Sequence, residues 1–256
     1  MIANYHTHTW RCKHADGLEQ DYIEAAIAAG MQVLGFSDHT PYPFPNGYVS
    51  FFRMAPAQAS DYFSTLTELK QRYAGKIELH FGVEAEYYPA RFDALLELLR
   101  QFPCDYMIMG QHFIHNEIDG VYSGRETDDP SVLRQYVTQV LEGLSTGFFT
   151  YLAHPDLLHW SGDEITYRRQ MERLCQGVKD LGVPLELNLL GLAEGRHYPN
   201  ECFWEIAGQV GNCAILGCDA HRAADLNRPA IEQLGRELAA RHGIALLDRA
   251  QLKPLR

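Results

Sequence analysis

The chain has 256 residues, 46% of them apolar, and its 22 basic and 33 acidic side chains give a formal net charge of −11. A chain of this length can bury a large core, either as one α/β barrel or as two smaller domains. Its acidic balance disfavours nonspecific binding to nucleic acid or to anionic membranes. No apolar run approaches the ~20 residues that span a bilayer, and no secretion signal is recognisable, so we expect a cytoplasmic protein.

Six cysteines are spread along the chain without a Cys-x-x-Cys pair. This spacing argues against a zinc knuckle and against a dithiol redox motif, and it fits reduced, mostly buried thiols. Cys12 and Cys218 each lie within two residues of a candidate metal ligand, so either could add a soft ligand to a metal site or be sensitive to oxidation.

In the N-terminal half, short apolar runs alternate with segments of helical periodicity. The expected order is strand 1–3, helix 18–29, strand 32–36, helix 57–73, strand 76–81, helix 90–101 and strand 106–110. Gly30 is the expected C-cap of the first helix, because glycine adopts the left-handed conformation that ends many helices. Residues 41–56 are rich in proline and aromatic residues, and we expect them to form a surface lid.

The second half continues this alternation and ends in a loop-rich tail. We expect helix 131–146, strand 148–153, helix 167–181, strand 184–188, a helix that Asn200 caps and that runs to residue 210, strand 214–217, helix 228–242 and tail 243–256. Strand and helix alternate seven times without a linker between them. This pattern predicts a single parallel α/β barrel domain over residues 1–256.

Six of the seven expected strands are followed by histidine or carboxylate side chains. His6 and His8 are two residues apart, so in an extended strand they point to the same face. The carboxyl ends of all strands in a parallel barrel open on one side, which brings residues that are distant in sequence together. The nine candidate ligands are His6, His8, His14, His39, Glu84, His112, His154, Asp219 and His221.

A single buried histidine is usually a hydrogen-bonded core residue, but nine such groups would leave polar atoms unpaired unless metals took their lone pairs. Nine ligands exceed the needs of one ion, so we expect two or three divalent ions of Zn, Mn or Fe, with Glu84 as the bridge. Asp16 could replace His14 as a ligand. Asp38 and Asp156 either orient neighbouring imidazoles or are solvated turn residues.

A cluster of divalent ions with open positions suits hydrolysis, above all of phosphate esters, because bound water ionises near pH 7. A cationic side chain would help to hold the phosphate, and a guanidinium can do so through a bidentate fork. Arg196, which follows the sixth strand, is the first candidate for this role. Arg53, Lys13 and Arg125 are weaker candidates, each otherwise a surface residue.

Six motifs occur in one order along the chain: His6-Thr7-His8 with His14, Ser37-Asp38-His39, Gly82-Val83-Glu84, Gly110-Gln111-His112, His154-Pro155-Asp156 and Cys218-Asp219-Ala220-His221. Together they resemble the polymerase and histidinol phosphatase (PHP) family. The segments around Arg53-Met54, Glu84-Ala85-Glu86-Tyr87, His112-Phe113-Ile114 and Arg196 are most similar to stand-alone histidinol-phosphate phosphatases.

The resemblance implies a distorted seven-stranded (β/α)₇ TIM-like barrel with a trinuclear metal site at the C-terminal strand ends. One metal would take His6, His8, Glu84 and Asp219, a second Glu84, His112 and His154, and a third His14, His39 and His221. A metal-activated hydroxide would hydrolyse histidinol phosphate, in histidine biosynthesis, with Glu84, Asp219 and His221 as the catalytic side chains. A metal-bound water, His221 or Asp16 could protonate the leaving group.

One position departs from the family pattern. Many phosphatase members have a basic residue after the His154 motif, whereas this chain has Leu157-Leu158-His159-Trp160. The departure bears on the substrate, so the alternative is a PHP phosphoesterase that acts on another small phosphate ester, such as a nucleotide or sugar phosphate.

An inactive metal-binding or regulatory module is the alternative from another class, although all nine ligand positions hold competent residues. A nuclease is disfavoured because the chain is acidic and has no appended nucleic-acid domain. We therefore expect the partner to be a small phosphorylated metabolite, with no binding of nucleic acid or membrane.

Overall fold

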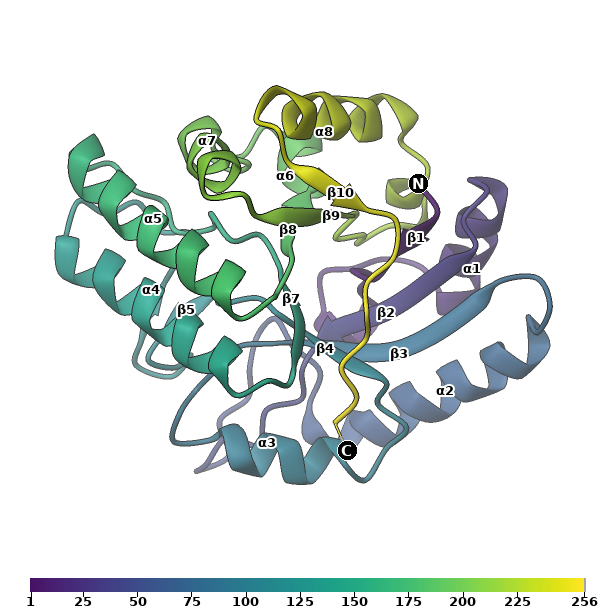
Figure 1. Ribbon diagram of the computed structural model, residues 1–256. Helices are drawn as coiled ribbons and strands as arrows, with labels where there is room; N and C mark the ends of the chain where they lie inside the picture. Colours follow the sequence, from purple (N-terminus) through teal and green to yellow (C-terminus); the bar gives the residue numbers. More distant parts are fainter. Residues whose placement is uncertain (256) are drawn as a thin grey trace.

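The computed structural model describes residues 1–255, which form an eight-stranded parallel sheet curled into a half-barrel with helices outside it (Figure 1). The strand order is β1-β2-β3-β4-β7-β8-β9-β10. These strands are β1 (Ala3–Asn4), β2 (Val33–His39), β3 (Glu78–Ala85), β4 (Tyr106–Met109), β7 (Phe149–Leu152), β8 (Leu185–Asn188), β9 (Cys213–Gly217) and β10 (Ala245–Leu247). The distorted TIM-like α/β barrel expected from the sequence is confirmed.

The segments that follow β1 and β9 meet at the carboxyl edge of the sheet. Thr7 and Ala220 form an isolated parallel bridge, in which the His8 amide donates to the Ala220 carbonyl at 2.9 Å. Toward the amino end of the sheet, β10 pairs with β9. The segments that follow β1 and β9 are therefore held together where they deliver their polar side chains.

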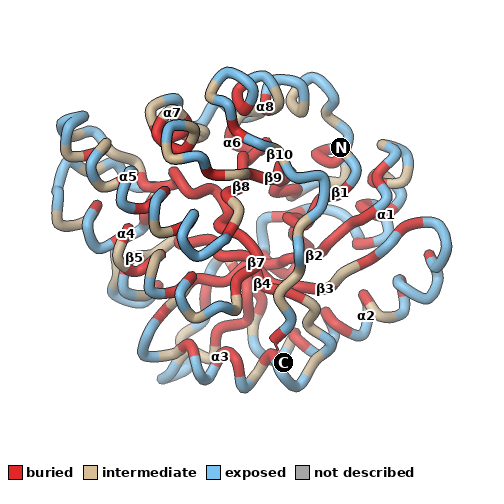
Figure 2. Tube along the Cα trace, in the orientation of Figure 1, coloured by how far each residue is buried: buried red, intermediate tan, exposed pale blue. Residues whose placement is uncertain are grey.

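The helices are α1 (Glu19–Ala28), α2 (Ala59–Arg72), α3 (Phe92–Leu99), α4 (Pro130–Ser145), α5 (Glu164–Asp180), α6 (Leu189–Glu194), α7 (Glu201–Val210) and α8 (Pro229–Arg241), with 3₁₀ turns η1 (Trp10–Cys12), η2 (Pro56–Gln58) and η3 (Ala223–Leu226). Figure 2 shows the central strands buried, while β10 is largely exposed and the helices are exposed on their outer sides. No helix within residues 1–255 combines the length and apolar character needed to cross a bilayer.

Three elements differ from the sequence prediction. The tail contains strand β10, and residues after β8 form the short helix α6, whose N-terminus is capped by the Asn188 side chain accepting from the Gly191 amide. An antiparallel hairpin, β5 (Phe113–Ile114) with β6 (Val121–Tyr122), follows β4. These elements have two to six residues, too few to display a clear period of 2.0 or 3.6.

The barrel interior is filled by a small cluster of apolar residues that includes three tyrosines. The cluster contains Ala3, Tyr5, Val33, Tyr106, Ile108, Tyr151, Ala153 and Ile215, with Ala250 and Leu252 of the tail packed against it. The single hydroxyl proton of Tyr106 is shared between the carbonyl oxygens of Tyr5 at 2.7 Å and Phe36 at 3.1 Å, and this bifurcated hydrogen bond links three strand segments. A Cβ at Gly82 would lie 2.6 Å from the Tyr106 ring, so glycine is needed there.

We predict that Tyr106→Phe lowers the free energy of unfolding by about 1–3 kcal/mol, because a buried hydrogen bond shared by two carbonyl oxygens is lost. Tyr88→Phe is the matched control, since the buried Tyr88 hydroxyl has no hydrogen-bond partner among the described residues. Its removal should leave stability unchanged or slightly raised. Urea unfolding followed by circular dichroism measures both, and equal effects of the two substitutions would contradict the role given to the Tyr106 hydroxyl.

Candidate metal centre

The nine candidate ligands converge at the carboxyl edge of the sheet. His39 ends β2 and Glu84 lies near the end of β3, while His112, His154, Asp219 and His221 follow β4, β7 and β9. His6 and His8 follow β1 and are fully buried, and His14 follows η1. The convergence predicted from the strand ends is therefore present in the structure.

Glu84 lies at the centre of this cluster, with its two carboxylate oxygens facing different histidines. Its Oε1 atom is 2.8 Å from His154 Nε2 and 3.5 Å from His112 Nε2. Its Oε2 atom is 2.9 Å from His39 Nδ1 and 3.6 Å from Nε2 of both His6 and His8. A carboxylate shared in this way has the arrangement that a bridging ligand requires.

Space for Glu84 depends on a glycine in the next strand segment. A Cβ at Gly110 would overlap the Glu84 carboxylate. Gly217 does the same for a second buried carboxylate, because a Cβ there would overlap the end of Glu186. These two glycines at strand ends are thus part of the site, although neither can bind a ligand through a side chain.

Asp219 is the second acidic group of the cluster. Its Oδ1 atom lies 3.0 Å from His8 Nε2, 3.4 Å from His6 Nε2 and 3.5 Å from His221 Nδ1. Both Asp219 and His154 have positive backbone φ angles, 48° and 28°, which non-glycine residues rarely adopt. Such conformations persist where the surrounding structure requires a side chain in one position.

A separate group is formed by His14, His39 and His221, whose nitrogen atoms lie within 4.8 Å of one another. His14 Nδ1 donates to the Cys12 carbonyl at 2.7 Å, and His221 Nδ1 donates to the Asp219 carbonyl at 2.9 Å. Because each Nδ1 carries the proton, each Nε2 keeps its lone pair. Both imidazoles are therefore held in the tautomer that a metal ligand needs.

Several polar atoms of the cluster are buried without a hydrogen-bond partner among the described residues. They are Nε2 of His6, His8 and His221, Nδ1 of His39 and His154, and Oε2 of Glu84. Unpaired buried polar atoms are costly and rare in folded proteins, so several of them aimed at one point require an explanation. Imidazole nitrogens mixed with carboxylate oxygens suit divalent transition-metal ions, and the site fits such ions on this ground.

Three further carboxylates hold the imidazoles from behind. Glu186 accepts from His6 Nδ1 at 2.8 Å, Glu86 accepts from His112 Nδ1 at 3.0 Å, and Asp38 lies 3.4 Å from His8 Nδ1. Such partners fix the tautomer and orientation of metal-binding histidines. Sequence reasoning left Asp38 open between two roles and did not identify Glu86 or Glu186, although a charged residue inside a buried strand is a recognisable signal.

Asp156 does not orient an imidazole. Its carboxylate accepts from the Asn200 backbone amide at 2.6 Å and so anchors the start of α7 to the segment after β7. Burial raises the pKa of Asp156 to about 6. The structure therefore gives this residue neither of the two roles considered for it, since it is buried and bonded to backbone.

The charges within the cluster depend on one another. Burial opposes the protonation of His6, but Glu186, Asp219 and Glu84 outweigh it and raise the pKa of His6 to about 10. Burial likewise opposes the ionisation of Glu84, yet His112, His39 and His6 hold the pKa of this carboxyl well below its usual range. Without metal, a proton on His6 therefore offsets part of the negative charge of the buried carboxylates, whereas burial lowers the pKa of His39 and His221.

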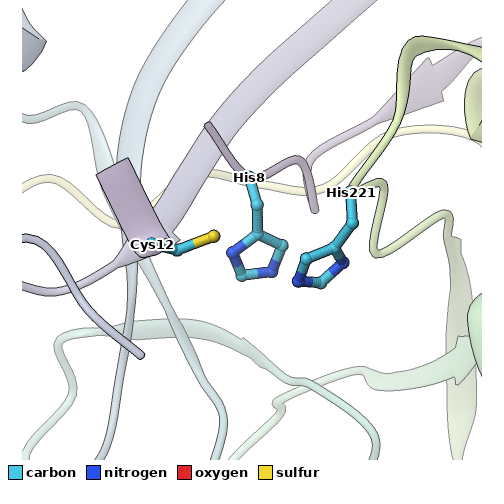
Figure 3. Close-up of side chains that lie close together, drawn as sticks. All are labelled: His8, Cys12 and His221. Atoms are coloured by element: carbon cyan, nitrogen blue, oxygen red, sulfur yellow. The ribbon is translucent and has the colours of Figure 1, made fainter. Parts of the chain in front are cut away.

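Cys12 lies beside this cluster, as Figure 3 shows, with His8 between its thiol and the ring of His221. The three side chains form a further group whose ligand atoms are within 4.8 Å of one another. Burial raises the pKa of the Cys12 thiol. Cys218 belongs to the apolar core and to none of the ligand groups found in residues 1–255.

Above the cluster is a cavity of about 840 Å³. Its floor contains His14, His39, Glu84, His112, His154, Asp219 and His221, and its walls include Phe51, Phe52, Phe113, Tyr122, Leu157, Leu190 and Tyr198. The aromatic loop expected to be a lid thus contributes Phe51 and Phe52 to the wall. A small molecule with an apolar ring and one strongly polar end matches this lining.

Arg196 is the one predicted phosphate contact that lines the cavity. Arg53 is instead buried, paired with Glu86 at 3.0 Å and Glu117 at 2.7 Å, so it holds the carboxylate behind His112. The Lys13 ammonium donates to the Ser50 carbonyl, and neither Lys13 nor Arg125 lines the cavity. Arg222, which sequence reasoning did not consider, also lines it.

Comparisons with known proteins identify a family and related chains. A family model described as PHP domain matches residues 4–189. A relative named "Probable histidinol-phosphatase" in Deinococcus radiodurans is 27% identical, with 88% of each chain covered. "Histidinol-phosphatase" of Bacillus subtilis is 24% identical, over 86% of this chain and 94% of that one.

Among solved structures, histidinol phosphate phosphatase from Lactococcus lactis, complexed with zinc, L-histidinol and phosphate, superposes with a TM-score of 0.75. The match covers 98% of both chains at 18% sequence identity. At this identity the likeness shows that the two chains share the fold.

We predict that Glu186→Gln weakens divalent metal binding about 10- to 100-fold, because the neutral amide holds His6 less firmly in its ligand orientation. Zinc titration in competition with a chromogenic chelator measures the affinity. Glu172→Gln, at an exposed position on α5, is the control and should leave it unchanged. An unaltered affinity in the Glu186 variant would contradict the supporting role of this carboxylate.

Proposed function

The chain belongs to the PHP domain family, and from this premise we propose that it is a hydrolase, a metal-dependent phosphomonoesterase that converts histidinol phosphate to histidinol and phosphate. The observation that carries the proposal is the central position of Glu84, whose two oxygens face histidines from four different strand ends. The relatives from Deinococcus radiodurans and Bacillus subtilis, named "Probable histidinol-phosphatase" and "Histidinol-phosphatase", match this chain over 88% and 94% of their own length. Their names support histidinol phosphate as the substrate.

The ligand sets we propose are His6, His8, Glu84 and Asp219 for one ion, Glu84, His112 and His154 for a second, and His14, His39 and His221 for a third. The ligand groups His6-His8-Asp219 and His14-His39-His221 support the first and third sets. The zinc bound in the Lactococcus lactis structure supports zinc as the metal of this chain, and Mn and Fe are the other candidates. Bound ions of this kind would acidify water and neutralise charge on the phosphate.

The remaining steps fall to side chains in the cavity. Arg196 would hold the phosphate by its guanidinium fork, as other arginines do with phosphate oxygens. The aromatic wall, including Phe52 and Tyr198, would pack against the organic part of the substrate and exclude bulk water. Asp16, which also lines the cavity, and His221 are the side chains that could give a proton to the leaving oxygen.

We further propose that residues 1–256 form one barrel domain, because the ligands come from strands at both ends of a single sheet. The cytoplasm is the proposed location, since all six cysteines are free, which fits a reducing compartment. The proposed partner is a small phosphorylated metabolite and not nucleic acid.

The alternative substrate is another small phosphate ester. This alternative is kept because Leu157 lines the cavity where many related phosphatases have a basic residue. A nucleotide or sugar phosphate would place a different organic group against the aromatic wall. The choice between these substrates is made by comparing kcat/KM values for a panel of phosphomonoesters.

We predict that the purified protein, loaded with Zn or Mn, releases inorganic phosphate from histidinol phosphate with a higher kcat/KM than from nucleotide or sugar phosphates. Chelation should abolish the release, and added metal should restore it, because the cluster needs cations to work. Phosphate is measured with a molybdate assay. Absence of phosphate release from every ester of the panel would refute the proposal.

A second prediction concerns the bridge. Glu84→Gln should lower the metal content of the purified protein and reduce phosphate release at least 100-fold, because an uncharged amide cannot join two cations. Glu78→Gln at the other, exposed end of β3 is the matched control and should behave like the wild type. Metal content is measured by elemental analysis, and full turnover in the Glu84 variant would exclude a bridging role.

A further inference from the structure

The cavity contains few positive side chains for an enzyme whose substrate is a dianion. Among the described residues, Arg196 and Arg222 are the lysine or arginine side chains that line it. Leu157 occupies the wall after the His154 motif, so this segment supplies no charge. How the two arginines are bonded therefore decides how much positive charge the cavity can offer to a phosphate.

Arg196 is engaged through all three guanidinium nitrogens. Nε and Nη2 lie 2.9 Å and 2.7 Å from Glu194 Oε2, and Nη1 donates to the Tyr198 hydroxyl at 2.6 Å. Glu194 also lines the cavity, so this pair brings no net charge to it. Three of its five N–H groups are thereby in use, so Arg196 offers a phosphate only the remaining N–H groups of Nη1 and Nη2, and Glu194 compensates its charge.

Arg222 is held much less firmly. Its nearest acidic partner, Asp225, is 3.5 Å from Nη2, and more than half of its side chain is exposed. Asp225 already has other partners, because Oδ1 accepts from the Arg228 guanidinium and Oδ2 accepts from the backbone amides of His221 and Arg222. The Arg222 guanidinium can therefore leave Asp225 without exposing a buried, unpaired carboxylate.

The two arginines also belong to different parts of the cluster. Arg222 follows His221 directly and so lies next to the His14-His39-His221 group. Arg196 is bonded to Tyr198, whose ring is 6.0 Å from that of His154 on another strand end. A phosphate on the cavity floor could thus be approached by a guanidinium from each of these two sides.

We propose that Arg222 is a phosphate-binding residue, which supplies the positive charge that the segment after His154 lacks. It turns from Asp225 into the cavity and donates two N–H groups to oxygens of a phosphomonoester or of inorganic phosphate. This inference rests on the proposed phosphatase function for its substrate, but it concerns the binding of phosphate itself and can be tested without turnover.

The test compares Arg222→Gln with Arg125→Gln, which removes the same charge from an exposed site that does not line the cavity. Calorimetric titration of the metal-loaded protein with inorganic phosphate gives the dissociation constant. It should rise about 10- to 100-fold in the Arg222 variant, as expected for the loss of a charged hydrogen-bonding pair, and stay within twofold in the control. Arg222→Lys should retain part of the affinity.

Metal content and Tm are measured on the same samples. These measurements separate a loss of phosphate binding from a loss of metal binding at the neighbouring His221 and from unfolding of the variant. Wild-type phosphate affinity in a metal-loaded, folded Arg222→Gln protein would overturn the inference. If the wild type bound phosphate through Arg222 but hydrolysed none of the esters, the proposed function would fail while this assignment held.

Discussion

The organisation of the site depends on one buried carboxylate surrounded by imidazoles. Glu84 is 1% exposed and lies within 3.6 Å of five histidine nitrogens. In a dry interior neither a carboxylate nor an imidazolium is stable alone, so Glu84 and the imidazolium of His6 hold each other in the charged form. A divalent cation would neutralise the same carboxylate without requiring protons on the histidines. The cluster therefore suits bound metal ions, whereas such a group of side chains would be unusual in a protein core that binds no ion.

The constraint extends outward from Glu84 through the strands next to it. Gly110 must lack a side chain because the Glu84 carboxylate occupies that space, and Gly217 leaves space for Glu186 in the same manner. Glu186 and Glu86 then fix His6 and His112 by accepting their Nδ1 protons. The buried Arg53 pairs with Glu86. From the sequence, Arg53 is a weak candidate for phosphate binding and otherwise a surface residue, whereas in the structure it supports the carboxylate that orients His112.

Most of the architecture could be predicted from the sequence because seven apolar runs alternate with segments of helical periodicity, and the ligand positions follow from where parallel strands end. The short elements β10, α6 and the β5-β6 hairpin were missed because their few residues have too little pattern. The places of Arg53, Lys13 and Asp156 could not be predicted either. Each is decided by partners distant in sequence, such as Glu117 for Arg53 and Asn200 for Asp156, and no local pattern reports those contacts.

The distribution of arginines explains how a chain with a net charge of −11 can receive a dianion. Arg53 is enclosed with two carboxylates and contributes no positive field to the cavity, and Arg196 is neutralised by Glu194 at the wall. Positive charge at the floor must then come from cations bound by the histidine cluster and from the loosely paired Arg222. A guanidinium that already has a tight acidic partner must give up part of that interaction to bind phosphate, which reduces the net free energy of phosphate binding. An arginine with a weak partner is therefore the better phosphate ligand. Selectivity for phosphate over a neutral ester would accordingly arise at Arg222 and the metal cluster, with Arg196 adding the N–H groups that Glu194 and Tyr198 leave free.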